Sequence, residues 1–203
     1  MRRQLQTILV AGLILIATAA VGASAFTSAT VERQTTASVT TDENGLLGLS
    51  DGTSGNLVYQ DATTGQLVIN MTNGTAGGIN TDALFTLGDP ANPASTYAFS
   101  VTNNDAEAHQ ITVAYALTTD DSDSSENLNF RIYDSSETLV GTVTEEGGTV
   151  AIDAAPAETF TVILSIDTGH GAAGTLTSAD DLSGTLSFTV DDVAEGGTVS
   201  DGS

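Results

Sequence analysis

The segment Thr159–Asp167 reads TFTVILSID, and its pattern decides the fold class. Apolar side chains occupy every second position, at Phe160, Val162, Leu164 and Ile166. A period of two places these side chains on one face of an extended strand, whereas a helix would need a period near 3.6. Threonine, valine and isoleucine also favour strands. The segment therefore predicts a β-strand with one face turned toward a core.

The same alternation recurs in Tyr97–Thr102 and Gln110–Leu117. Elsewhere, short Thr-, Val- and Ile-rich runs are separated by clusters of Gly, Asn, Asp and Ser, as in all-β proteins. Only Ile79–Leu84 is compatible with a turn of helix. The other expected strands are Ala29–Val39, Leu46–Leu49, Leu57–Tyr59, Gln66–Asn70, Leu128–Tyr133, Thr138–Val143, Thr149–Ile152 and Ser183–Val190.

Many short strands with polar turns between them predict one antiparallel β-sandwich of Ig-like or jelly-roll type, preceded by an N-terminal signal helix. The clearest turns are expected at Asn103–Asp105, Glu145–Gly148 and Asp153–Pro156. The expected domains are a signal peptide over residues 1–25, a single β-sandwich domain over residues 26–193 and a flexible acidic tail over residues 194–203.

The N-terminus has the pattern of an export signal. Arg2 and Arg3 precede the apolar stretch Ile8–Ala23, and Ala23-Ser24-Ala25 is a small-x-small cleavage site. As a helix, the apolar stretch would span about 24 Å, less than the roughly 30 Å hydrocarbon core of a bilayer. We therefore expect a secreted protein that meets the membrane only through this segment before cleavage. A retained signal anchor is the alternative, and the arginine pair leaves the twin-arginine export route open.

The composition is strongly acidic. The chain carries 26 acidic residues and four basic ones, with no lysine and no cysteine. Without Arg2 and Arg3, two arginines face 26 carboxylates, a formal charge of −24. Molar salt shortens the Debye length to roughly 3 Å and screens such repulsion, so a folded protein from a salt-rich habitat is expected. A disordered acidic chain is the alternative, which the 40% hydrophobic content disfavours. Nucleic acids are excluded as partners, because binding phosphate needs a basic surface.

No motif for catalysis or cofactor binding is present, so an enzyme is not expected and no catalytic residue is predicted. His109 and His170 have no zinc-ligand spacing. The acidic run 120–126 offers a weak calcium candidate at Asp121, Asp123 and Glu126, because Ca²⁺ prefers carboxylate oxygens. It lacks the glycine and distant glutamate of an EF-hand loop, and a solvated hairpin loop is the alternative.

Two N-glycosylation sequons follow one another directly. They are Asn70-Met71-Thr72 and Asn73-Gly74-Thr75. Asn70 and Asn73 are therefore glycosylation candidates on an exported chain. Because sequons also arise by chance in Asn- and Thr-rich sequences, the pattern leaves occupancy open.

Several short motifs carry a family resemblance. They are Ala25–Arg33 (AFTSATVER), Leu46–Leu49, Gly78–Ala83, Phe99–Asn103 and Ile166–Thr168. Together they resemble a family of haloarchaeal secreted β-sandwich proteins. That family is similar in turn to the TasA/camelysin biofilm-matrix proteins and the archaeal bundling pilins. The resemblance implies a structural protein whose subunits join by donor-strand exchange. It does not extend to the metalloprotease activity ascribed to camelysin-type proteins, because no HExxH motif is present.

The expected function is therefore that of an extracellular structural subunit, in a cell-surface filament, a pilus-like fibre or a biofilm matrix. Cleavage after residue 25 would expose an N-terminal strand with Ala29, Val31, Ala37 and Val39 on one face. Such a strand can complete the sheet of a neighbour through main-chain hydrogen bonds. The partners expected are copies of the chain or other envelope proteins. Pairing of this strand within its own domain is the alternative, as is a monomeric module that recognises a glycan or an envelope protein.

Overall fold

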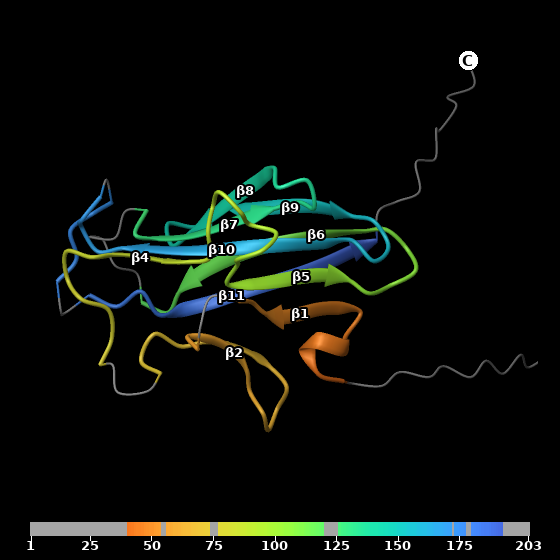
Figure 1. Ribbon diagram of the computed structural model, residues 1–203, viewed down its shortest axis with the longest axis horizontal. Helices are drawn as coiled ribbons and strands as arrows, with labels where there is room; N and C mark the ends of the chain where they lie inside the picture. The colour runs from red at the N-terminus through yellow and green to blue at the C-terminus, as the bar shows by residue number, and fades with distance from the viewer. Residues whose placement is uncertain are drawn as a thin grey trace, which may run out of the picture. The chain divides into compact units, whose positions relative to one another are not determined.

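The computed structural model describes residues 40–53, 56–73, 77–119, 126–171, 173–177 and 180–192. The predicted signal helix, the predicted strand Ala29–Val39 and the predicted tail lie outside these residues. Within them the protein is all-β, with antiparallel sheets and a single short 3-10 helix, η1 (Asp42–Asn44) (Figure 1). No helix in this part of the chain is long and apolar enough to span a bilayer.

The larger sheet has six strands. Its order is β1 (Leu47–Asp51), β5 (Phe99–Asn103), β10 (Thr159–Asp167), β7 (Leu128–Tyr133) and β8 (Leu139–Thr144), with β4 (Leu84–Leu87) also pairing with β10. β5 pairs with the first half of β10, where Phe160 lies opposite Val101. β4 pairs with its second half, where Ile166 lies opposite Phe85. β10 is thus the central strand of this sheet.

The smaller sheet has three strands, and a separate hairpin lies beside the sheets. The order of the smaller sheet is β11 (Gly184–Asp192), β6 (His109–Leu117) and β9 (Thr149–Ala154), and the hairpin consists of β2 (Val58–Gln60) and β3 (Leu67–Ile69). β6 pairs with β11 over nine residues and with β9 over six. All of these pairings are antiparallel.

The apolar faces of the two sheets meet in one core. Phe99 of β5 makes edge-to-face contacts with Phe130 of β7 and with Phe188 of β11, at ring-centroid distances of 6.5 and 6.4 Å. Tyr115 of β6 packs on Phe130 at 5.3 Å. The second and third contacts join the two sheets, so the arrangement is sandwich-like. Such aromatic pairs add to the stabilisation from buried area.

The alternation in Thr159–Asp167 is confirmed, with one addition. Phe160, Val162, Leu164 and Ile166 are buried, as the period of two predicts. Ile163 faces the opposite side and is nevertheless fully buried. The reason is the chain around Gly88, which lies so close to Ile163 Cδ1 that a side chain at position 88 would collide with it. A loop thus covers the outer face of the central strand.

Most predicted strands are confirmed within one or two residues at each end, and Thr159–Asp167 and Leu128–Tyr133 match β10 and β7 fully. The predicted helical turn at Ile79–Leu84 is wrong. Asp82 has φ 54°, outside the helical region, and Leu84 already belongs to β4. Thr168 instead satisfies the main-chain N–H and C=O groups of Ala83. Its N–H donates to Ala83 O and its Oγ1 accepts from Ala83 N–H, both at 2.8 Å.

Candidate functional site

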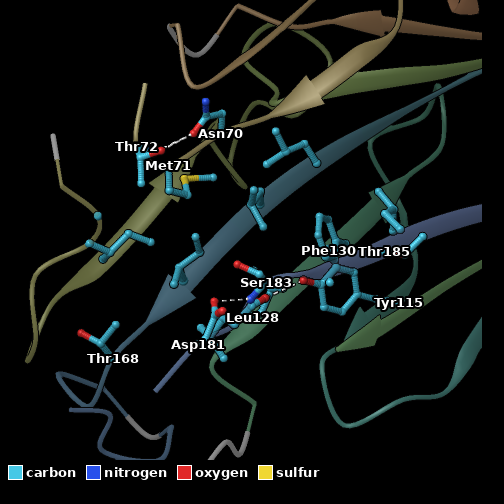
Figure 2. Close-up of a pocket in the computed structure, with 18 of the residues that line it drawn as sticks. Asn70, Met71, Thr72, Tyr115, Leu128, Phe130, Thr168, Asp181, Ser183 and Thr185 are labelled. Carbon is cyan, nitrogen blue, oxygen red and sulfur yellow. Dashed lines mark hydrogen bonds between the residues drawn. The ribbon is translucent and has the colours of Figure 1, made fainter. Parts of the chain in front are cut away.

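A groove of about 840 Å³ opens between the two sheets beside β11 (Figure 2). Its apolar lining comes from both sheets and from the hairpin. These residues are Leu128 and Phe130 of β7, Leu164 and Ile166 of β10, Tyr115 of β6, Leu186 and Phe188 of β11, Leu49 of β1, Leu67 and Ile69 of the hairpin, and Met71, Ile79, Leu176 and Leu182 of the connecting segments. We call this feature the β11 groove. It is large enough to hold a peptide strand or a sizeable apolar ligand.

Among the described residues, the core is therefore incomplete on one side. The floor of the groove, formed by β7 and β10, is fully buried, but Leu186 and Phe188 on its wall are only partly buried. The same holds for Leu67 and Ile69 of the hairpin. Val190, which continues the inward face of β11, is 43% exposed. Apolar surface at this position would be stabilised by a partner that covers it.

β11 is also an edge strand. It pairs with β6 on one side, and no described strand pairs with its other side. β1 forms the corresponding edge of the larger sheet, and Figure 1 shows β1 and β11 on the same side of the described domain. Leu49 of β1 and Gly184 of β11 both line the groove. The groove thus combines uncovered apolar side chains with unpaired main-chain donors and acceptors, which together form a template for another strand.

Tyr115 closes one wall of the groove. Its hydroxyl donates to Leu182 O at 2.6 Å (Figure 2). Burial, followed by the negative charges of Asp181 and Glu145, raises its pKa to about 12. The phenol therefore stays protonated at neutral pH and acts as a hydrogen-bond donor that holds the segment leading into β11.

Acidic residues line the rim, and carboxylate oxygens of two of them already accept hydrogen bonds from nearby residues. Asp42 Oδ2 accepts the N–H of Leu67 at 2.8 Å. Asp180 Oδ2 accepts the N–H and the hydroxyl of Thr177 at 2.6 and 3.0 Å. These carboxylates fix the ends of the hairpin and of the loop before β11. Within the described ranges, no group of three or more His, Asp or Glu residues is placed to hold a metal ion.

Behind the groove, a buried polar network joins β7, β8 and β10. Asn127 is fully buried, and its Nδ2 donates to Asp167 O and to Gly174 O at 2.5 and 2.6 Å. The carboxylate of Glu145, 4% exposed, accepts the N–H of Asn127 and of Leu128. Leu128 lies in the groove floor, so this network positions the floor.

Asp167 orders the loop that follows β10. Burial alone would raise the pKa of Asp167, but hydrogen bonds from the N–H groups of Gly171, Gly169, Ala173 and His170 lower it below its ordinary value. The Gly171 and Gly169 bonds to Oδ1 both measure 3.0 Å. A Cβ at position 171 would collide with Asp167 Oδ2, so a larger residue there would have to displace this carboxylate.

Asp167→Ala is expected to lower the free energy of unfolding by about 1.5–3 kcal/mol at pH 7, because several N–H groups of the following loop, in part-buried hydrogen bonds, lose a charged acceptor. The folded-state pKa is depressed, so this stabilisation is present above the ordinary value of 3.8 and is lost as the pH falls through the folded-state pKa. Chemical denaturation at pH 7 and near pH 2 measures both effects. Asp51→Ala, at an exposed position on β1, is the control. Equal losses in the two variants at pH 7 would contradict the prediction.

The predicted calcium residues lie only in part within the structure. Asp121 and Asp123 fall outside the described residues. Glu126 is exposed, has φ 53°, and its main-chain oxygen accepts from Asn129 Nδ2 at 2.7 Å. The polymerisation residues Ala29, Val31, Ala37 and Val39 also lie outside the described residues. These assignments stay predictions.

The structure separates the two histidines. His109 Nε2 lies 2.7 Å from Asp105 Oδ2, and this hydrogen bond lowers the pKa of Asp105. His170 Nδ1 lies 3.7 Å from Asp82 Oδ1 in an exposed pair. His109 begins β6, opposite Ala154, and His170 follows the end of β10. They therefore do not share a site.

Sequence reasoning missed the β11 groove and the network behind it. Glu145 lies in the predicted turn at Glu145–Gly148, but its side chain is buried, which the turn pattern does not indicate. Asn127 borders the acidic run and carries no local sign of burial. A faint signal for the groove exists in β11, where Leu186, Phe188 and Val190 alternate as inward residues although the smaller sheet ends there. Comparison with known proteins adds no assignment, since no family model and no curated protein matches this chain.

Proposed function

We propose that this protein is a non-enzymatic extracellular subunit of a filament, pilus-like fibre or biofilm matrix, with an Ig-like or jelly-roll sandwich as its scaffold. Assembly proceeds by donor-strand exchange. The N-terminal segment of one copy, residues 26–40, occupies the β11 groove of the next copy. The observation that carries the proposal is the coincidence of an uncovered apolar groove with an unpaired edge strand of nine residues.

The segment fits the groove in length and pattern. Fifteen extended residues reach roughly 50 Å, whereas a nine-residue strand such as β11 needs only about 30 Å. Ala29, Val31, Ala37 and Val39 fall on one face of such a strand. That face can cover Leu186 and Phe188, while its main chain pairs with the free edge of β11.

The segment also fits in charge. Residues 26–40 contain one acidic residue, Glu32, and one basic residue, Arg33, so they are neutral in a chain that is otherwise strongly acidic. A neutral segment avoids the repulsion that the acidic segments of a second copy would meet. Asp180 and Asp181 line the groove, and Arg33 is complementary to them.

A head-to-tail contact of this kind repeats. Each copy offers one segment and one groove, so the interface is heterologous and produces open chains rather than closed dimers. This accounts for a fibre or a matrix rather than a discrete oligomer. A secreted protein of this charge is expected to assemble at the cell surface, where salt screens the repulsion between neighbouring subunits.

Deleting residues 26–40 is expected to abolish polymers and leave a folded, monomeric domain. The measurement is electron microscopy in molar salt, together with light scattering and circular dichroism. A synthetic peptide of residues 26–40 should then bind the truncated domain with one-to-one stoichiometry. Leu186→Glu should abolish this binding, because it places a charge in the groove. Thr189→Glu, on the outward face of β11, is the matched control and should bind normally.

The outcomes separate transfer between copies from pairing within one chain. Polymers that persist after the deletion would contradict the proposal. A full-length protein that stays monomeric at high concentration would assign the segment to its own domain. The alternative of a monomeric binding module receives less support, because Tyr115 and Tyr133 are buried and Tyr59 and Tyr97 are half-buried, which leaves no exposed row of tyrosines to stack on a glycan.

A further inference from the structure

We propose that Asn70, and not Asn73, is the residue of this adjacent pair that carries an N-linked glycan. The two sequons share no residue, but their asparagines are only three positions apart. Both asparagines satisfy the sequon equally well in the sequence, but their side chains form different hydrogen bonds in the structure. The inference concerns modification of the exported chain and is independent of polymerisation.

The side chain of Asn70 is held with its reactive nitrogen directed outward. Asn70 Oδ1 accepts the N–H of Thr72 at 2.9 Å and the hydroxyl of Thr72 at 2.8 Å. The main chain is fixed as well, since the N–H of Asn70 donates to Leu57 O at 2.7 Å. Figure 2 shows Nδ2 on the far side of the amide, pointing away from the β11 groove. No described residue accepts a hydrogen bond from this nitrogen.

Asn73 is exposed, whereas Asn70 is partly buried, but the side-chain nitrogen of Asn73 is engaged in a hydrogen bond. Its Nδ2, the atom that a glycan would modify, donates to Asn56 O at 2.6 Å. Modification at this position requires the bond to break and the side chain to turn. A net hydrogen bond corresponds to a factor of roughly 2 to 10 in an equilibrium, so the folded chain favours Asn70 by about that factor.

The reaction is a glycosyl transfer catalysed by an oligosaccharyltransferase that acts on the folded chain. Its co-substrate is an oligosaccharide activated at its anomeric carbon by a phosphate or diphosphate group. Asn70 Nδ2 forms a bond to the anomeric carbon. The carbon–oxygen bond to phosphate breaks, its electron pair leaves with the phosphate oxygen, and one Nδ2 proton passes to a base of the transferase. No oxidant or reductant is needed.

The position of Asn70 determines where the glycan lies. Asn70 directly follows β3, at the rim of the groove. Because Nδ2 points away from the groove, the glycan covers the outer side of the hairpin and leaves the groove open.

The test is peptide mapping by mass spectrometry of the protein purified from cells that naturally produce it. Occupancy at Asn70 is expected to exceed that at Asn73 by roughly twofold to tenfold. Asn70→Gln should remove most of the glycan mass, whereas Asn73→Gln should remove only the minor part. Thr72→Ser should keep the glycan and Thr72→Val should remove it, with circular dichroism confirming that each variant is folded.

Equal occupancy of both asparagines, predominant occupancy of Asn73, or two bare asparagines would each overturn the proposal. A second experiment tests whether the glycan is transferred to the folded or to the unfolded chain. The purified unglycosylated protein is treated with an oligosaccharyltransferase and its lipid-linked donor, either folded in molar salt or unfolded in urea. A preference for Asn70 that is present in the folded sample and absent in the unfolded one supports the structural argument. The same preference in both samples would refute it.

Discussion

Transfer of the purified protein from molar KCl into about 10 mM buffer at pH 7 is expected to unfold the domain. The formal charge of the whole chain is −22, and removal of residues 1–25 would make it −24. At this ionic strength the Debye length rises from roughly 3 Å to about 30 Å, so carboxylates across the whole surface repel one another. Unfolding relieves that repulsion by moving the charges apart.

The structure contains little that could offset this repulsion. Within the described ranges, the ion pairs closer than 4 Å both involve histidine, and neither involves an arginine. Arg131 forms no ion pair with a described carboxylate. Many of the acidic side chains instead accept hydrogen bonds from nearby main-chain groups, as Asp61 does from Thr63 and Thr64. Such bonds order the turns but do not neutralise their charge.

Circular dichroism and intrinsic tyrosine fluorescence across a salt series measure the effect. Refolding is expected when KCl or NaCl is restored, with equal midpoints at equal ionic strength, because screening depends on ionic strength. An uncharged osmolyte such as sucrose, at the same osmolality, should restore less structure. A spectrum that stays unchanged in low salt would refute the expectation and would also count against adaptation to a salt-rich habitat.

Asn127→Asp is expected to destabilise the domain by about 3–5 kcal/mol at pH 7 in molar salt, because it leaves an uncompensated buried charge. The change replaces Nδ2, which donates to Asp167 O and Gly174 O, with an oxygen that repels both carbonyl groups. The carboxylate of Glu145, bound to the N–H of position 127, adds a like charge nearby.

Asn129→Asp is the matched control. Asn129 lies two residues away on β7, is only partly buried, and its Nδ2 donates to Glu126 O in an exposed hydrogen bond. The same change there should cost no more than about 1 kcal/mol. Urea denaturation of both variants and the parent in molar salt gives the comparison.

The pH dependence provides a second measurement. Burial and the two carbonyl oxygens would raise the pKa of the carboxyl introduced by Asn127→Asp, so the penalty grows as the pH rises above the unfolded value near 3.9. The variant should therefore regain stability relative to the parent as the pH falls from 7 toward 4. A difference that does not change with pH, or equal losses at positions 127 and 129, would show that Asn127 does not hold the network together.

The strands could be predicted because their signal is local. In Gln110–Leu117, apolar residues at every second position predict the buried face of β6, and Ile111, Val113 and Tyr115 are buried as expected. β4 was missed because its four residues are too few to show a period, and three of them are exposed. Its pairing depends on β10, which lies about 80 residues later in the chain.

The candidate site could be predicted only in part. Asn70 and Asn73 are visible as sequons, but the sequence cannot tell which side-chain nitrogen is engaged, because the acceptor Asn56 O lies 17 residues away. Glu145 resembles its neighbour Glu146 in a glycine-containing turn. Only the main-chain donors of Asn127 and Leu128, brought beside it by the pairing of β7 with β8, bury one carboxylate and not the other.

The amino-acid sequence by itself determined the all-β class, the position of most strands, the apolar face of each and the extreme acidity of the chain. These follow from side-chain period and composition, which are properties of neighbouring residues. Only the tertiary structure decided that, among the described strands, β11 ends the smaller sheet with an open groove beside it, and that Asn127, Glu145 and Asp167 support its floor. Strand order and the burial of single polar groups depend on which distant main-chain groups come into contact. The local sequence pattern contains no information about these long-range contacts.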